Sequence, residues 1–151
     1  MNVYWDTSAL AAVYLRDACT KQATELFDSM RYPTSSWLCY SETRAAFRAC
    51  TDAKKISAAK HADIVERFER DWALFHKIPV KSTLSPELRR IFKHHSLRGA
   101  DAVHLASAIL MNMRLMVANK QIVFACDDRN LATAADADGL ILAWMPSKTK
   151  N

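Results

Sequence analysis

Residues 121–131, QIVFACDDRNL, place two aspartates directly after an apolar run. A continuous apolar run of this length is typical of a strand buried on both faces, and such strands belong to parallel sheets that helices cover. Asp127 and Asp128 then lie where the strand ends. Sites in open α/β sheets form outside the carboxyl ends of the strands, so this stretch predicts a fold class and the place of a site.

Short apolar runs and helical patterns alternate along the rest of the chain. Further strands are predicted at 2–5, 33–40 and 140–144, with a short strand or extended link at 77–81. Helices are predicted from Ser8, across 20–30, after caps at Ser41, Ser57 and Ser85, and across 101–116 and 130–138. Gly139 stands where the last helix needs a left-handed residue. We expect a three-layer α/β/α domain with a parallel sheet of about five strands.

The length of 151 residues predicts one domain with one core, which needs neither a disulfide nor a structural metal to fold. We assign residues 1–146 to this domain and 147–151 to a polar tail. A net charge of +5 permits a polyanionic partner such as nucleic acid without requiring one.

The cysteines and the apolar segments bear on the compartment. No CxxC pair occurs among the four cysteines, at positions 19, 39, 50 and 126, which favours reduced thiols in a cytosolic protein. Neither a signal peptide nor an apolar run of about 18 residues is apparent. We therefore expect a cytoplasmic protein without a membrane partner.

Four acids fall where a predicted strand ends or a predicted helix begins. Asp6 ends the first strand and Asp128 follows the fourth, while Glu42 and Asp101 lie in first turns of helices. Each acid alone is equally well explained by the preference of helix N-termini for negative charge. Together they would repel one another unless a cation joined them, and hard cations such as Mg²⁺ or Mn²⁺ take oxygen ligands. Such ions activate water and stabilise charge on a phosphodiester, so the set predicts metal-dependent phosphoryl transfer.

Four segments carry a more specific resemblance. They are YWDTSAL at 4–10, SETRAAF at 41–47, RGADAVHLASA at 98–108, and FACDDRNL at 124–131 with AADADGL behind it. In this order the chain resembles the PIN-domain family, and most of all the VapC-type ribonuclease toxins of toxin–antitoxin pairs. The resemblance implies an endoribonuclease with Mg²⁺ (or Mn²⁺) as cofactor, RNA as substrate, a cognate antitoxin as partner, and a homodimer.

The resemblance also assigns the site. It implies that Asp6, Glu42, Asp101 and Asp128 are the catalytic and metal-binding residues. Asp128 is preferred to Asp127 because the family's acid is followed three residues later by a leucine, and Leu131 has that spacing. Where the family often has threonine two residues before this acid, the chain has Cys126.

Two other functions remain open. Aspartyl-phosphate phosphatases also begin with an aspartate after the first strand, but they need a second aspartate two residues later, where this chain has Ser8. A catalytically degenerate PIN domain could act as an RNA- or protein-binding module. We interpret His104 as a packing residue. The basic stretch from Arg89 to Arg98 could hold RNA phosphates, but we interpret it as a solvated helix face, the commoner explanation.

Overall fold

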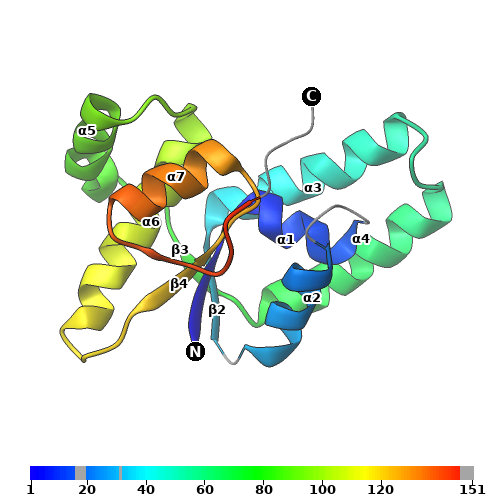
Figure 1. Ribbon diagram of the computed structural model, residues 1–151. Coiled ribbons are helices and arrows are strands. Elements are labelled where there is room, and N and C mark those ends of the chain that lie inside the picture. The colour runs from blue at the N-terminus through cyan, green and yellow to red at the C-terminus, as the bar shows by residue number, and fades with distance from the viewer. Residues whose placement is uncertain (16–19, 31, 147–151) are drawn as a thin grey trace.

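A sheet of five parallel strands forms the centre of the part of the chain that the structure describes. This computed structural model describes residues 1–15, 20–30 and 32–146. The strand order is β3-β2-β1-β4-β5 (Figure 1), and each neighbouring pair is parallel. The strands are β1 Asn2–Trp5, β2 Tyr32–Ser36, β3 His76–Ile78, β4 Ile122–Ala125 and β5 Ile141–Leu142. The predicted parallel sheet is confirmed.

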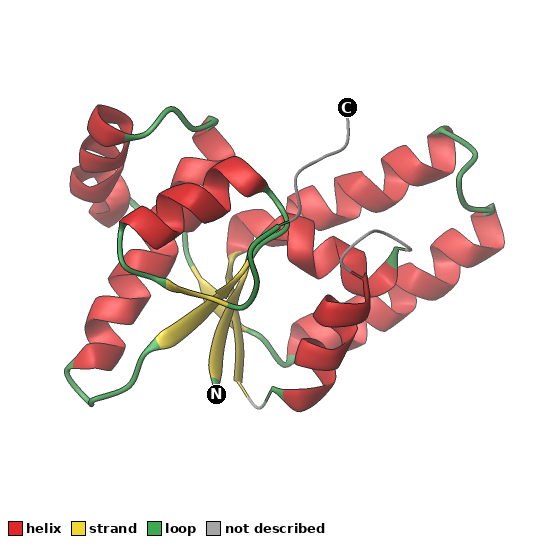
Figure 2. Cartoon of the chain, in the orientation of Figure 1, coloured by secondary structure: helices red, strands yellow, loops and turns green. Residues whose placement is uncertain are grey.

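Helices cover both faces of this sheet, which confirms the three-layer α/β/α prediction (Figure 2). One layer holds α1 Thr7–Tyr14, α2 Thr20–Ser29, α3 Trp37–Asp52 and α4 Ala58–Ala73. The other holds α5 Ser85–His94, α6 Gly99–Met116 and α7 Arg129–Ala137, with a 3₁₀ turn, η1 Ser82–Leu84, before α5. The long α3–α4 hairpin extends beyond the sheet (Figure 1).

The alternation of side chains along the strands divides the interior into two cores, where the sequence predicted one. Val3 and Trp5 of β1 pack among α1–α4, whereas Tyr4 between them packs among α5–α7. Tyr4 stacks on Phe124 of β4 with ring centroids 5.5 Å apart. Because successive strand residues point to opposite faces, the buried apolar run seen in the sequence supplies both cores at once.

The boundary between β2 and α3 differs from the sequence prediction. The strand predicted at 33–40 ends at Ser36, and α3 begins at Trp37. Ser36 is the N-cap, with its hydroxyl accepting from the Leu38 N–H, while Ser41 lies inside the helix and donates to the Leu38 carbonyl. Glu42 is therefore in the second turn of α3, not the first. Tyr40 packs on Phe68 of α4 at 5.7 Å, and such tertiary packing favours helix in an apolar stretch whose period is ambiguous.

Other predicted boundaries shift by a few residues. The Ser57 cap is confirmed by its bond to the Lys60 N–H, but the Ser85 cap is wrong, because Ser85 is already helical and η1 precedes it. Gly139 has φ of +80°, as predicted. The helix predicted from Asp101 begins at Gly99, and β4 and β5 are shorter than their apolar runs.

The expectations about cysteines, the polar tail and membrane spans can be compared with the described residues. Cys39, Cys50 and Cys126 are free thiols, whereas Cys19 and the predicted tail at 147–151 lie outside the described residues. Within those residues, each helix is too short or too polar to cross a bilayer.

Replacing Ser36 with alanine removes the N-cap of α3 and should lower the free energy of unfolding by about 1 kcal/mol. Ser41→Ala is the matched control, since its hydroxyl caps nothing, and it should change stability by less than about 0.5 kcal/mol. Urea unfolding followed by circular dichroism measures both. A larger loss from Ser41→Ala than from Ser36→Ala would place the helix start where the sequence suggested.

Candidate active site

Asp6 lies at the point where β1 passes into α1. Its N–H donates to the carbonyl of Ala125 at 2.9 Å, which continues the pairing of β1 with β4. Its side chain caps α1, with Oδ2 accepting from the N–H of Ser8 at 3.0 Å and from the Ser8 hydroxyl at 2.6 Å. Asp6 is only 4% exposed. It thus performs the structural task expected of a helix cap and also points a buried carboxylate at the carboxyl edge of the sheet.

The segment after β4 lies beside Asp6. Cys126 is buried, and its thiol lies 3.7 Å from Asp6 Oδ2 and 3.3 Å from the backbone nitrogen of Asp128. Burial raises the pKa of this thiol far above its ordinary value, so it stays protonated as a weak donor. The Asp127 N–H donates to Ser8 at 2.8 Å. The contacts of Cys126 and Asp127 therefore link the end of β4 to the end of β1.

Glu42 approaches the same edge from α3. Its Oε2 accepts a hydrogen bond from the Thr7 hydroxyl at 2.7 Å and lies 2.8 Å from Nε2 of His104. Partial burial favours the neutral acid, but the bonds from His104 and Thr7 outweigh it and hold the pKa of Glu42 below its ordinary value. Glu42 is therefore a carboxylate at neutral pH.

His104 is buried, as expected, but its polar contacts were not foreseen. Burial opposes a charge on the ring, yet the carboxylates of Asp6 and Glu42 outweigh it and raise the pKa of His104 above its ordinary value. Its Nε2 lies 3.8 Å from Asp6 Oδ1. The sequence did contain a signal for these contacts. His104 lies one turn after Asp101, so both residues are on the same face of the helix, and that face is the one directed at the site.

Asp101 and Asp128 form a second pair, which Arg98 joins. The Arg98 Nε donates to Asp101 at 2.8 Å, and its Nη2 donates to Asp128 at 3.3 Å. Asp128 also caps α7 by accepting from the Leu131 N–H at 3.0 Å. The bond and charge of Asp101, followed by the charge of Asp128, raise the pKa of Arg98. Arg98 was assigned to a solvated face, and its side chain is indeed 76% exposed, but its two acidic partners were not foreseen.

Two other members of the basic stretch also have acidic partners. Arg90 makes two bonds to Asp138, at 2.9 and 2.7 Å, and His95 lies 3.2 Å from the same carboxylate. Arg89, Lys93 and His94 are exposed, as a solvated face requires. The stretch is therefore partly structural and partly solvent-facing.

The structure thus arranges the four predicted acids as two pairs, Asp6 with Glu42 and Asp101 with Asp128. Among the described residues, no three His, Cys, Asp or Glu side chains are close enough to hold a metal ion as they stand. The donor set nevertheless fits a hard cation, because carboxylate oxygens are its preferred ligands and the guanidinium of Arg98 already bridges two of them. The four-residue ligand set remains a prediction.

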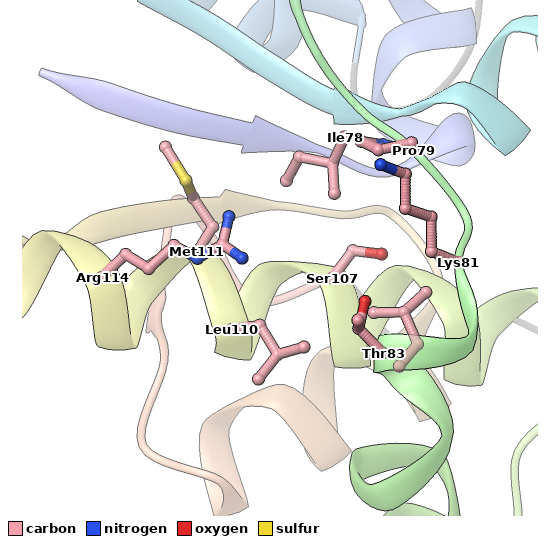
Figure 3. Close-up of a pocket in the computed structure, with 9 residues that line it drawn as sticks. Ile78, Pro79, Lys81, Thr83, Ser107, Leu110, Met111 and Arg114 are labelled. Carbon is pink, nitrogen blue, oxygen red and sulfur yellow. The ribbon is translucent and has the colours of Figure 1, made fainter.

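A cavity elsewhere has different chemistry. About 240 Å³ in volume, it lies between α6 and the segment after β3, and none of the four acids lines it. In Figure 3 the side chains of Arg114 and Lys81 lie on opposite sides of the view, with Ile78 above and Leu110 below. It is therefore separate from the acidic edge, which is the carboxyl edge of the sheet where the four predicted acids lie.

Comparison with known proteins places the fold and the segments in one family. Residues 3–135 match the PIN domain. The chain belongs to the PIN-domain family. It is 34% identical over 141 residues to ribonucleases VapC45 and VapC49 of Mycobacterium tuberculosis, strains CDC 1551 / Oshkosh and ATCC 25618 / H37Rv, covering 93% of this chain and 94% of each relative.

Solved structures share the PIN fold with this chain at lower identity. FitAcB from Neisseria gonorrhoeae has a TM-score of 0.67 and 17% identity, over 93% of this chain and 95% of that one. VapC20 of M. tuberculosis, a sarcin-ricin loop cleaving toxin, has a TM-score of 0.62 and 17% identity, over 96% and 100%. FitAB bound to the IR36 DNA fragment has a TM-score of 0.67 and 18% identity, over 98% and 99%.

Removing Arg98 should make Mn²⁺ bind more tightly, because the ion would no longer displace a guanidinium from two carboxylates. An exposed pair of this kind contributes up to about 1 kcal/mol, so Arg98→Ala should lower the Mn²⁺ dissociation constant by up to about fivefold. Isothermal titration calorimetry of the protein without RNA measures this. Arg89→Ala removes the same charge from an exposed position and should change little; weaker Mn²⁺ binding by Arg98→Ala would contradict the expectation.

Proposed function

We propose that this protein is a metal-dependent endoribonuclease that acts as the toxin of a toxin–antitoxin pair. The observation that carries the proposal is the gathering of Asp6, Glu42, Asp101 and Asp128 at one edge of a PIN-domain sheet. The full-length likeness to two VapC ribonucleases supports it.

The substrate is RNA, and the reaction is hydrolysis of a phosphodiester bond. A net charge of +5 favours binding of a polyanion. A protein of the same fold is described as cleaving the sarcin-ricin loop, and unpaired loops are where proteins read RNA most readily. Cleavage within such a loop suits a site that lies at an open edge of the sheet.

Asp6, Glu42, Asp101 and Asp128 would hold Mg²⁺ or Mn²⁺ together, some directly and some through water. A bound ion of this kind supplies an activated water and stabilises negative charge on the phosphate. The chain's own residues prepare the ligands: Ser8 fixes Asp6, His104 and Thr7 bond to Glu42, and the cap of α7 orients Asp128. No histidine is needed as the base.

The proposed partner is a cognate antitoxin, with the toxin forming a homodimer in the cytoplasm. The bridging of Asp101 and Asp128 by Arg98 supports one element of this proposal, since it is an example of a guanidinium accepted at the acidic edge. An antitoxin that presents its own arginine there would meet the same two carboxylates. Such a contact would compete directly with the metal.

One observation favours the alternative, a PIN domain that binds RNA or protein without cleaving it. As the side chains stand, His104 and Arg98 occupy positions between the acids. A binding module would keep these contacts in the presence of Mn²⁺ and would not cleave RNA.

Purified protein should cleave RNA in the presence of Mg²⁺ or Mn²⁺ and stop when EDTA is added. Asp101→Asn should lower the rate about 100-fold or more, because losing a ligand removes several kcal/mol of transition-state stabilisation. Asp136→Asn removes the same charge from an exposed position and should cleave normally. Undiminished cleavage by the metal-stripped protein would refute metal dependence, and no cleavage under any condition would favour the binding module.

Asp128→Asn should reduce cleavage at least about tenfold more than Asp127→Asn does. Asparagine is as good an N-cap as aspartate, so α7 should keep its start and the variant its melting temperature. The neighbouring substitution is a control for charge and position. The opposite order would assign the metal ligand to Asp127.

A further inference from the structure

We propose that His104 is a positioning residue of the nuclease site, holding Glu42 and through it the geometry of the metal ligands. The inference rests on the proposed function and adds a residue to it. His104 would touch neither RNA nor metal, and its task is to donate one hydrogen bond in a fixed direction.

The ring of His104 is held at both of its nitrogens. Nδ1 lies 3.0 Å from the hydroxyl of Tyr4, and Nε2 lies 2.8 Å from Glu42 Oε2 and 3.3 Å from the Thr7 hydroxyl. His104 is 1% exposed. Losing either bond would leave a polar atom buried without a partner, which is unfavourable, so the orientation of the ring is determined.

Tyr4 supplies the rigid end of this chain of contacts. It is fully buried and packed between two rings, stacked on Phe124 and edge-on to His104 at 6.0 Å. Its backbone belongs to β1, the strand that Asp6 directly follows. His104 therefore relates the position of Glu42 on α3 to the strand that carries Asp6.

In Glu42 and in Asp6, the hydrogen bonds are made to only one of the two carboxylate oxygens. Both donors to Glu42, from His104 and Thr7, converge on Oε2, and the described residues offer no hydrogen bond to Oε1. In Asp6, Ser8 occupies Oδ2, whereas Oδ1 lies 3.8 Å from His104, beyond hydrogen-bond distance. Each carboxylate is thus anchored by one oxygen and keeps the other for a cation.

This arrangement differs from simple packing in what it requires of the side chain. A packing residue must fill the volume, and any side chain of similar size and polarity would do so. A positioning residue must place an N–H where Nε2 of His104 lies. Glutamine can place its amide nitrogen near that point, whereas the shorter asparagine reaches only the position of Nδ1, beside Tyr4.

The test compares His104→Gln with His104→Asn, which insert the same amide group at two depths. The primary measurement is the Mn²⁺ dissociation constant without RNA, from electron paramagnetic resonance of free Mn²⁺. Because loss of an outer hydrogen bond to a metal ligand typically weakens binding 10–100-fold, we expect His104→Asn to weaken it about tenfold or more and His104→Gln no more than about threefold. Melting temperatures in EDTA should fall by similar amounts in both.

Two tyrosine variants keep the test decisive if an amide variant does not fold. Tyr4→Phe removes only the hydroxyl that orients His104 and should weaken Mn²⁺ binding severalfold. Tyr14→Phe is its matched control, since it removes a buried hydroxyl bonded to Asp71 in the other core. It should lower the melting temperature without changing Mn²⁺ affinity.

The outcomes separate this inference from the proposed function. Folded His104→Asn that binds Mn²⁺ as tightly as wild type, equal losses in both amide variants, or wild type without measurable Mn²⁺ binding would overturn the role of His104. If the two amide variants differ clearly in Mn²⁺ affinity but the protein cleaves no RNA, the positioning role of His104 stands and the nuclease function is refuted.

Discussion

The pairing of β1 with β4 is the contact on which the site depends. Parallel pairing in register, from Asn2 with Ile122 to Trp5 with Ala125, brings two segments 120 residues apart to a common end. Asp6 extends the ladder by one further bond to Ala125. Because both strands finish together, the acids that follow them are delivered to the same edge, and the helices that begin there add Glu42 and Asp101.

The main physical difficulty at that edge is negative charge. Carboxylates at 4% to 30% exposure cannot rely on water to stabilise them, so each needs a donor. The chain supplies short-range donors to Asp6 and Asp128 through helix caps, an imidazole to Glu42, and a guanidinium to Asp101. The two charged or chargeable donors differ in burial: His104 is 1% exposed, while the side chain of Arg98 is 76% exposed. The buried His104 is therefore held in place, whereas the exposed Arg98 side chain can move away from the two carboxylates.

The fold class, the parallel sheet and the order of the acid-bearing segments were predictable from the sequence, because continuous apolar runs and their terminal acids are local patterns. The start of α3 was not, since Trp37 to Tyr40 suits a strand or a helix equally and its packing on α4 decides. The partners of His104 and Arg98 were not predictable either. Helical spacing shows which face a residue occupies, but the identity of the atom across from it depends on how α6 lies on the sheet.

The connections at the acidic edge are unusually short. Asp6 alone separates β1 from α1, β2 passes into α3 without an intervening residue, and three residues join β4 to α7. Asp6 and Asp128 cap the helices that follow them, and the Asp127 N–H is bonded to the Ser8 hydroxyl, so an insertion there would move an acid as well as lengthen a loop. Changes of length are easier to accommodate in segments that carry none of the four acids, such as the turn between α3 and α4 or the stretch from β3 to α5. The edge that carries the four acids is therefore built from connections whose length cannot change without moving one of those acids.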